Sequence, residues 1–382
     1  MGRQLRIVFA APAYWPATAF GGPVPVLRSL ARELSVLGHR VDVLTTTLTG
    51  IGEQPARTSR TDEVDGATVR YLGTPLRFRW FGVTPSLRRV LGSLPRPDVV
   101  HVFGYRDWVS TVTARWCRAN GVPYVFEPLG MFAPKLRKVA LKHALDSTLY
   151  RAVPRGAALA IVASERERQE LEAVVPPERV VVRPNGFPAP YDPPPRPGPL
   201  RSRLGLDATV PLVLSVGRVA RGKGLEHLVP AVASLDGVQL AIAGPDDRHG
   251  LLPELLALRD RLGAGGRVHM LGAVEFPLEL YGDADVLALP SAHENFGMVA
   301  AEAAAAGTAS VVSDRCGVAE VMRDRGALVI PYGEAPLRAA LARLLGDAGL
   351  RAQLGRGGRQ VARELSWPNI VRLQAEIYEC VV

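Results

Sequence analysis

The residues that could do chemistry are concentrated in two stretches of the second half of the chain. The first stretch reads Gly217-Arg218-Val-Ala-Arg221-Gly222-Lys223-Gly224 and directly follows a short apolar run. It satisfies most of the Walker A pattern, but position 224 is glycine where a Ser or Thr hydroxyl would hold magnesium. A magnesium-dependent P-loop NTPase is therefore disfavoured. Arg218 and Lys223 are instead predicted to bring a planar guanidinium and a compact ammonium to one anionic group such as a phosphate.

The second stretch begins Pro290-Ser-Ala-His-Glu294-Asn-Phe-Gly297 and continues into an alanine-rich segment that contains Glu302. We expect a helix to start near Gly297, where the first free N–H groups make an anion site without any side chain. Eight residues of helix span about 12 Å, more than the roughly 5 to 9.5 Å between the paired carboxyls of glycosidases. Glu294 and Glu302 are therefore expected to have separate duties, one near a reacting sugar and one at the far end of a ligand.

Three other features carry weaker signals. Gly21-Gly22 opens a helix after the first apolar run, and a glycine pair there allows the backbone to approach a pyrophosphate. His101 lies at the end of another expected strand. Asp283-Ala-Asp285 has the spacing of a metal-binding pair, but it precedes a strand, where turn residues are common, so we interpret it as structural.

The elements that must position these residues follow an alternating pattern of strands and helices. An apolar strand at 5–11, a loop at 13–25, a helix at 26–37 and a strand at 41–45 form one βαβ unit. The other expected strands are 99–103, 124–126, 159–163, 180–182, 212–216, 239–243, 268–271, 286–289, 310–312 and 327–330.

Residues 188–200 contain seven prolines and are predicted to form a linker, because proline fits neither a helix interior nor a central strand. The expected fold is therefore α/β, with two doubly wound Rossmann-like domains facing a central cleft. Ligands should bind at the carboxyl ends of the strands.

Composition and charge place the chain in the globular class. Of its 382 residues, 47% are apolar and 22% charged, and no uncharged apolar run reaches the roughly 18 to 20 residues that span a bilayer. Cys117, Cys316 and Cys380 are too widely separated to indicate a disulfide framework or a zinc site. A reducing cytoplasm is the expected location.

The net charge of +9 is unevenly distributed. Residues 1–186 hold 26 Lys and Arg against 15 Asp and Glu, whereas residues 187–382 hold 20 against 22. Two basic stretches, 77–89 and 135–142, interleave cations with apolar residues. They are consistent with an acidic acceptor pocket, an anionic membrane surface or an ordinary solvated face, and nucleic acid is the weakest alternative because no nucleic-acid-binding motif accompanies them.

The combined motifs resemble those of glycosyltransferase family 4, the retaining GT-B enzymes that use nucleotide-diphosphate sugars. The resemblance covers nearly the whole chain. Its matching motifs are Gly21-Gly22, Gly-His-Arg-Val-Asp-Val at 38–43, Asp-Val-Val-His-Val-Phe-Gly at 98–104, Arg-Pro-Asn-Gly at 183–186, Gly217-Arg218 with Lys223-Gly224, Pro290-Ser291 with the Glu294/Glu302 pair, and Ser366-Trp367.

This resemblance implies a role for each candidate residue. Arg218 and Lys223 would neutralise the leaving diphosphate, Glu294 would hold the hydroxyls of the donor sugar, and Glu302 would bind the nucleotide ribose. Other donor contacts would come from Gly21, Gly22, Asn295, Phe296, Gly297, Met298 and Val299. No metal and no separate cofactor would be required, since the cations and a helix N-terminus stabilise the leaving group.

The resemblance also implies a division of labour between domains. Residues 1–187 with 366–382 would form the acceptor-binding domain, 188–200 the linker and 201–365 the nucleotide-sugar-binding domain, with the last helix, 367–378, packing back on the first domain. Leu129 occupies the position where many members have a His or Arg near the reacting sugar. His101 and Glu127 are therefore the candidate substitutes in the first domain.

The expected activity is transfer of a sugar from a UDP- or GDP-sugar to a lipid-linked saccharide or a small molecule. Pro-Leu-Gly-Met at 128–131 resembles the subgroup that builds cell-surface polysaccharides, which favours a cytoplasmic enzyme that binds peripherally to the inner face of the membrane. A natural-product glycosyltransferase with a soluble acceptor, a GT-B-like sugar-nucleotide epimerase and a non-enzymatic basic binding module remain alternatives.

Overall fold

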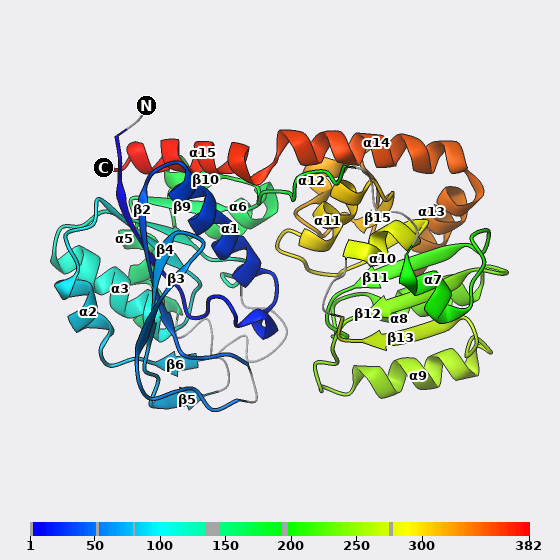
Figure 1. Cartoon of the computed structure of the whole chain (residues 1–382), viewed down its shortest axis with the longest axis horizontal. Coiled ribbons are helices and arrows are strands. Elements are labelled where there is room, and N and C mark those ends of the chain that lie inside the picture. The colour runs from blue at the N-terminus through cyan, green and yellow to red at the C-terminus, as the bar shows by residue number, and fades with distance from the viewer. Residues whose placement is uncertain (1–2, 51–52, 79–80, 134–145, 193–197, 275–277) are drawn as a thin grey trace. The chain divides into compact units, whose positions relative to one another are not determined.

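The chain folds into two compact α/β units in a computed structural model that describes residues 3–50, 53–78, 81–133, 146–192, 198–274 and 278–382. Unit 1 comprises Met1–Asn185 and Trp367–Val382, and unit 2 comprises Gly186–Ser366 (Figure 1). The proline-rich stretch at 188–200 thus belongs to unit 2. The expected linker extended to residue 200, but helix α7 (Pro199–Leu204) already begins at Pro199. Proline is tolerated in the first turn of a helix, where its missing N–H has no intrahelical acceptor.

Unit 1 is built on a sheet of eight described strands in the order β10-β9-β8-β7-β1-β2-β4-β3. All neighbours are parallel except β3, which runs antiparallel to β4. The strands are β1 (Arg6–Ala10), β2 (Arg40–Thr46), β3 (Arg60–Val64), β4 (Ala67–Leu72), β7 (Val99–Phe103), β8 (Tyr124–Glu127), β9 (Leu159–Val162) and β10 (Val180–Val182), and β5 (Leu76–Phe78) pairs separately with β6 (Phe81–Val83).

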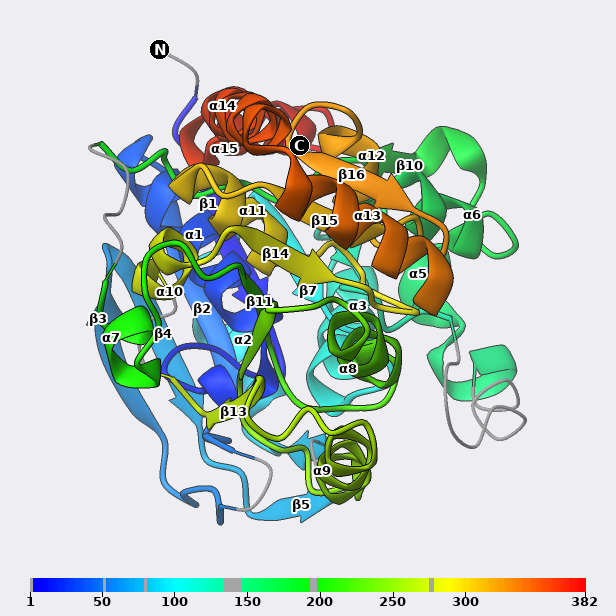
Figure 2. The same ribbon diagram turned by 90° about the vertical axis from the view of Figure 1, so that its right-hand side faces the viewer.

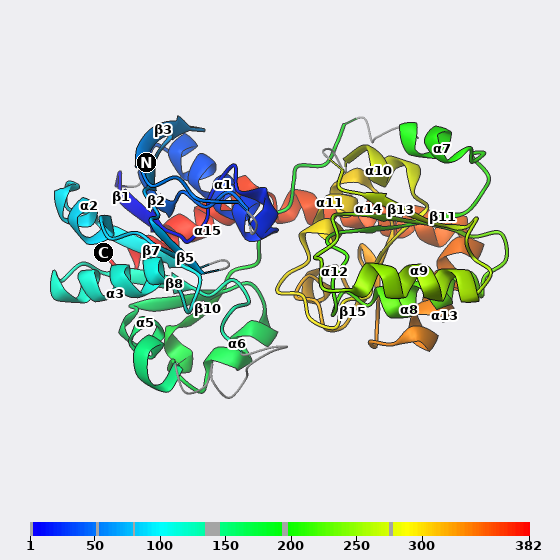
Figure 3. The same cartoon turned by 90° about the horizontal axis from the view of Figure 1, so that it is seen from below.

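Helices cover both faces of this sheet (Figure 3). Val8 and Ala10 of β1 pack into the core beneath α2, α3 and α5, whereas Phe9 lies on the opposite face, as expected from the alternation of side chains along a strand. The helices of unit 1 are α1 (Pro23–Val36), α2 (Leu87–Ser93), α3 (Trp108–Ala119), α5 (Ala152–Gly156), α6 (Glu165–Leu171) and α15 (Trp367–Glu379), with the short turns η1 (Thr18–Phe20), η2 (Asp146–Tyr150) and η3 (Pro177–Arg179). Helix α15 packs on α1, which confirms the predicted return of the last helix to the first unit.

Unit 2 has a six-stranded parallel sheet in the order β13-β12-β11-β14-β15-β16. Its strands are β11 (Leu212–Val216), β12 (Gln239–Ala243), β13 (Val268–Gly272), β14 (Val286–Leu289), β15 (Ser310–Ser313) and β16 (Ala327–Ile330). Its other helices are α8 (Leu225–Ala233), α9 (Leu251–Arg261), α10 (Leu278–Asp283), α11 (Met298–Ala306), α12 (Ala319–Met322), α13 (Glu334–Gly346) and α14 (Ala348–Glu364). Figure 2 shows α8, α9 and α13 on one face of the sheet and α10 and α11 on the other.

The strand order of unit 2 defines where a ligand should bind. Numbered along the chain, its six strands lie in the order 3-2-1-4-5-6, so the connections reverse direction between β11 and β14. In doubly wound sheets, ligands bind at the carboxyl ends of the two strands that flank this reversal. Those ends lead into the two loops that the sequence marked for chemistry, 217–224 and 290–297. The doubly wound α/β fold in two Rossmann-like units, the GT-B fold class predicted from the sequence, is confirmed.

Candidate active site

The loops after β11 and β14 contact each other through their backbones. Ala292 donates its N–H to the carbonyl of Gly222 at 2.8 Å. Gly224 has a φ of +72°, and a Cβ added there would lie 2.0 Å from the carbonyl oxygen of Pro290. Only glycine therefore fits at position 224, and this close approach holds the lysine-bearing loop against the glutamate-bearing loop.

Lys223 and Glu294 meet where the two loops touch. The Lys223 Nζ donates to Glu294 Oε2 at 2.5 Å, and the Ser291 hydroxyl lies 3.4 Å from the same oxygen. Both charged side chains keep about a quarter of their surface exposed, 28% and 22%, so a ligand can still reach them. Arg218 comes from the same loop, is exposed, and forms no ion pair with any described residue. The site thus combines one partnered cation, one exposed cation and one carboxylate.

Helix α11 starts at Met298, as predicted, and its first N–H groups open toward the ends of the strands. Gly297 caps it with a φ of +109°, where a Cβ would lie 2.8 Å from Leu289 Cδ2. Phe296 is buried and packs edge-on against Phe187, and its carbonyl accepts the N–H of Val318. These contacts fix the turn that precedes the helix.

The other donor-site candidates flank this turn. Asn295, Met298 and Val299 are all half-buried. The structure therefore places the predicted 295–299 segment directly beside Glu294.

Glu302 is half-buried on helix α11, and its carboxylate has a hydrogen-bond partner. Tyr281 of α10 donates its hydroxyl to Glu302 Oε2 at 2.6 Å. Burial raises the pKa of the Glu302 carboxyl, and the hydrogen bond from Tyr281 opposes this shift. Burial, together with the nearby charge of Glu302, raises the pKa of Tyr191 to about 12. Neither tyrosine was singled out from the sequence, because both contacts join residues that are distant along the chain.

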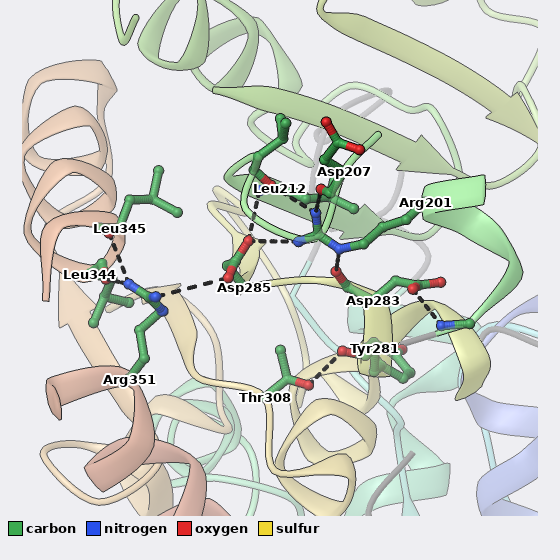
Figure 4. Close-up of polar contacts among 12 residues, drawn as sticks. Arg201, Asp207, Leu212, Tyr281, Asp283, Asp285, Thr308, Leu344, Leu345 and Arg351 are labelled. Carbon is green, nitrogen blue, oxygen red and sulfur yellow. Dashed lines mark hydrogen bonds and ion pairs between the residues drawn. The ribbon is translucent and has the colours of Figure 1, made fainter. Parts of the chain in front are cut away.

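Asp283 and Asp285 anchor the chain that enters unit 2, which supports their structural interpretation (Figure 4). The Asp283 carboxylate accepts the N–H groups of Gly198 and Leu200 at the start of α7, at 2.5 and 2.9 Å. The Asp285 carboxylate accepts from Arg201 and from the N–H of Leu212, both at 2.9 Å. No group of three His, Cys, Asp or Glu side chains within the described ranges is arranged to hold a metal ion.

Gly21 and Gly22 lie between β1 and α1 at the corresponding edge of unit 1. Gly21 has a φ of +82°, Gly22 is the residue before the first helical turn, and a Cβ at either would meet no atom within 4 Å. Their backbone is therefore open to approach. Helix α1 begins at Pro23, three residues earlier than expected, because prolines are compatible with a first turn.

His101 and Glu127 do not have the placement predicted for sugar contacts. Both side chains are fully buried inside unit 1, with exposed fractions of 0% and 1%. Glu127 accepts two bonds of 2.7 Å from Arg183, and its Oε2 lies 3.2 Å from His101 Nε2. His101 Nδ1 lies 2.7 Å from the Tyr378 hydroxyl of α15. The prediction is therefore corrected: these residues tie β7 and β8 to the last helix.

The electrostatics of this buried network are consistent with an internal ion pair. Burial lowers the pKa of His101, although the hydrogen bond and charge of Glu127 oppose the shift. Burial alone would raise the pKa of Glu127, but the Arg183 charge and the neighbouring His101 hold it below its ordinary value. Both oxygens of the buried carboxylate accept from the same guanidinium nitrogen, Nη2 of Arg183, and removal of either partner would leave an uncompensated charge.

Leu129 has an unusual backbone conformation. It has a φ of +54°, in the left-handed region that branched residues rarely adopt. The next residue, Gly130, donates its N–H to Glu167 Oε1 at 2.6 Å, and Glu167 Oε2 accepts the N–H of Ala163 at 2.9 Å. Glu167 is itself 3% exposed. This carboxylate therefore holds the strained turn at the end of β8, a role that was not predicted from the sequence.

The basic stretches of the first half are only partly described. Residues 135–142 lie outside the described ranges, so the prediction of a membrane or acceptor surface there is not tested. Within the described part of the chain, no helix combines the length and hydrophobicity that a membrane crossing requires.

Comparison with known proteins identifies the family of both halves. Residues 199–361 match the family described as Glycosyl transferases group 1, and residues 21–186 match the Glycosyl transferase 4-like domain. The chain is 32% identical to alpha-maltose-1-phosphate synthase of Mycolicibacterium smegmatis over 68% of its own length and 74% of that protein.

Other relatives match over shorter lengths or by fold. The chain is 38% identical to D-inositol 3-phosphate glycosyltransferase of Xylanimonas cellulosilytica over 47% of its length, and this match spans less than half, 44%, of that protein. The structure of HepE from Anabaena in complex with UDP and glucose superposes with a TM-score of 0.77 at 20% identity, covering 98% of this chain and 100% of the other, which shows a shared fold. The resemblance found in the sequence is confirmed: the chain belongs to the group 1 glycosyltransferases of the glycosyltransferase 4 type.

Proposed function

We propose that the protein transfers a sugar from a nucleotide-diphosphate donor, such as a UDP- or GDP-sugar, to a hydroxyl acceptor with retention of anomeric configuration. The observation that carries the proposal is the Lys223–Glu294 pair, which lies where the chain reverses between β11 and β14 beside the start of α11. A cation, a carboxylate and a helix N-terminus at one ligand-binding edge suit a donor that has both an anionic diphosphate and a hydroxylated sugar.

The chemistry requires stabilisation of the leaving group. As the bond between the sugar C1 and the diphosphate oxygen breaks, negative charge builds on that oxygen. Lys223, the exposed Arg218 and the N–H groups of α11 are preorganised cationic or dipolar groups that would stabilise this charge. Because these groups supply the positive charge, we propose that turnover needs no metal ion.

The two glutamates of the site would then bind opposite ends of the donor. Glu294, paired with Lys223 and still partly exposed, would accept hydrogen bonds from the sugar hydroxyls. Glu302, eight residues further on and oriented by Tyr281, would bind the ribose hydroxyls. The segment 295–299 would contribute backbone contacts between these ends. Gly21 and Gly22 of unit 1 are proposed as further donor contacts.

The acceptor is proposed to carry negative charge and to meet unit 1. The charge imbalance supports this, since residues 1–186 hold 26 basic against 15 acidic residues. The names of two relatives, alpha-maltose-1-phosphate synthase and D-inositol 3-phosphate glycosyltransferase, also contain phosphorylated compounds. Assembly of cell-surface polysaccharide or glycolipid at the inner face of the membrane is the proposed setting, with natural-product glycosylation as the alternative.

The test is incubation with a panel of UDP- and GDP-sugars in excess EDTA, with and without acceptor alcohols, followed by proton NMR of the products. The proposal predicts release of a nucleoside diphosphate and a product with the anomeric configuration of the donor. Inversion would contradict retention, and activity restored only by magnesium or manganese would contradict metal independence. Conversion of the donor into an isomeric nucleotide sugar without acceptor would instead identify an epimerase.

A further inference from the structure

The segment that follows β15 is hydrogen-bonded to the loop that carries Glu294. β15 pairs with β14 in the sheet, so residues 314–318 leave the sheet beside the 290–297 loop. Glu294 donates its backbone N–H to the carbonyl of Arg315 at 3.4 Å, and its own carbonyl accepts the N–H of Gly317 at 3.3 Å. Both backbone groups of the proposed sugar-binding glutamate are therefore bonded to this segment, which was not a candidate from the sequence.

Ser313, the last residue of β15, joins the same two segments through its side chain. Its hydroxyl donates to the carbonyl of Ser291 at 2.5 Å and accepts the N–H of Arg315 at 3.3 Å. The Ser313 side chain is fully buried. One hydroxyl thus bonds both to the 290–297 loop and to the residue whose carbonyl holds Glu294.

Ser291 lies between the two residues of its loop, 290 and 292, that contact the lysine-bearing loop. Its hydroxyl lies 3.4 Å from Glu294 Oε2, the oxygen that also accepts from Lys223. A shift of Ser291 would therefore disturb both the contact between the two loops and the Lys223–Glu294 pair.

Cys316 packs beside the Ser313 hydroxyl. Its Sγ lies 3.5 Å from Ser313 Oγ and donates to the carbonyl of Leu289, at the end of β14, at 3.8 Å. Burial raises the pKa of the Cys316 thiol to about 12, so the thiol keeps the proton that it donates. Ser313 and Cys316 therefore bond to the backbone on both sides of Pro290, where the 290–297 loop leaves the sheet.

The start of α11 is held by contacts that do not involve Ser313. The carbonyl of Phe296, two residues before the helix begins, accepts the N–H of Val318 at 2.7 Å. Loss of the Ser313 hydroxyl should therefore disturb Glu294 more than the N–H groups of α11, which are proposed to bind the diphosphate.

We infer that Ser313 is a positioning residue of the donor site, whose buried hydroxyl holds Glu294 where it would bind the hydroxyls of the donor sugar. Because its side chain is fully buried, Ser313 acts through Ser291 and Arg315 and not by contact with the donor. The inference rests on the proposed function, since it assigns what orients the sugar-binding carboxylate of that reaction.

The experiment compares Ser313→Ala with the matched control Ser310→Ala. Ser310 is also fully buried on β15, but its hydroxyl has no hydrogen-bond partner in the described part of the chain. Ser313→Ala should lower kcat for a nucleotide sugar roughly three- to tenfold, as expected when one hydrogen bond is lost, and Ser310→Ala should keep the wild-type value. Both are assayed well below their melting temperatures, so that a loss of stability alone leaves kcat unchanged.

Calorimetric titrations distinguish the sugar end of the donor from its diphosphate end. The probes are the UDP- or GDP-sugar of the panel that wild type binds most tightly and the corresponding nucleoside diphosphate. Ser313→Ala should bind the nucleotide sugar roughly three- to tenfold more weakly and the nucleoside diphosphate within about twofold of wild type, because Glu294 would contact only the sugar. Equal losses of affinity for the two probes would overturn the assignment.

A double-mutant cycle tests whether Ser313 acts through Glu294. Glu294→Ala leaves no carboxylate to position, so adding Ser313→Ala to it should change the affinity for the nucleotide sugar by less than about twofold. A further loss as large as that in the wild-type background would show that the hydroxyl acts independently of Glu294, which contradicts a positioning role.

The outcomes separate this inference from the proposed function. Wild-type kcat and sugar affinity in Ser313→Ala would overturn the positioning role and leave the transferase intact. If wild type binds a nucleotide sugar but transfers no sugar, the transferase is contradicted and the titrations still decide the role of Ser313. A wild type that binds no nucleotide sugar would overturn both.

Discussion

At the level of residues, the residue type and its place in the sequence were enough to predict single site residues. The hydrogen-bond partners of these residues were not predictable. Lys223 and Glu294 stood out because each follows a predicted strand, but their bond joins residues 71 positions apart. His101 and Glu127 were candidates because Leu129 stands where many family members have a His or Arg. Their burial was not predictable, since their partners Arg183 and Tyr378 lie in distant parts of the chain. The periodicity of one segment contains no information about a contact of this kind.

The buried Glu167 provides a prediction at this scale. Burial raises the pKa of its carboxyl from 4.5 to about 7, although the N–H groups of Ala163 and Gly130 oppose the shift. An unfolded chain releases this proton near pH 4.5, whereas the folded chain holds it until about pH 7. The folded state therefore binds more protons in that window, and this carboxyl makes stability fall as pH rises from about 4.5 to 7, by up to roughly 3 kcal/mol.

Glu167→Gln should flatten this dependence, because the amide does not titrate. Thermal unfolding at pH 5, 6, 7 and 8 measures it: the melting temperature of wild type should fall more steeply across the series than that of the variant, whatever their absolute values. Glu172→Gln, at an exposed residue directly after the same helix, should retain the slope of wild type. Parallel curves for wild type and Glu167→Gln would contradict the account.

At the level of elements, the buried parallel strands were the easiest to predict. Strands covered on both faces are continuous apolar runs, and β7, β10, β11, β12, β14 and β16 have the bounds that these runs predicted. The β3–β4 hairpin was missed because β3 is mostly exposed and polar. Its signal was present in Asp65-Gly66, both at positive φ, a dipeptide typical of tight hairpin turns.

The loop after β11 gives a prediction at the element scale. Gly224→Ala would place a Cβ 2.0 Å from the Pro290 carbonyl oxygen, so the two site loops would have to separate. Gly222→Ala is the matched control, since Gly222 also has a positive φ, +87°, but has no atom within 4 Å of an added Cβ. The control should lose only the roughly 1 to 2 kcal/mol of left-handed strain.

Differential scanning calorimetry and UDP or GDP titration measure both effects. Gly224→Ala should melt at a lower temperature than Gly222→Ala and bind nucleotide at least tenfold more weakly. Equal behaviour of the two variants would show that the contact between the loops does not position the site.

At the level of the whole molecule, the two doubly wound α/β units followed from the alternation of apolar runs with helical segments, whereas the order of the strands in each sheet came only from the structure. The unit boundary was harder to place. The proline-rich stretch suggested a free linker, but Asp283 binds Gly198 near its end and Asp285 binds Arg201 and Leu212 beyond it, and these contacts bridge more than 70 positions of sequence. Such long-range anchoring has no local signature.

The proposed setting at the inner face of a membrane predicts binding to anionic membranes through the basic residues of 1–186. Because exposed charges are screened over about 10 Å at 0.1 M salt, binding to anionic vesicles should exceed binding to zwitterionic ones and weaken as salt is raised. Replacement of Lys135, Arg137, Lys138 and Lys142 by Gln should reduce binding in a vesicle sedimentation assay and leave UDP or GDP affinity unchanged.

A control variant removes the same charge from unit 2. Gln in place of the exposed Arg203, Arg338, Arg343 and Arg356 should leave vesicle binding close to that of wild type. Equal binding of wild type to both vesicle types would contradict a membrane role and favour a soluble acceptor.

The measurement that tests the central claim most directly is turnover of the nucleotide sugar by three variants of one loop in excess EDTA. Lys223→Ala and Arg218→Ala should each lower kcat by roughly two to three powers of ten, as expected when a preorganised charge partner of the leaving group is removed. Arg221→Ala should turn over as wild type does, because Arg221 is exposed and paired with Glu254. Wild-type turnover by Lys223→Ala and Arg218→Ala would contradict the assignment of this loop to the donor diphosphate.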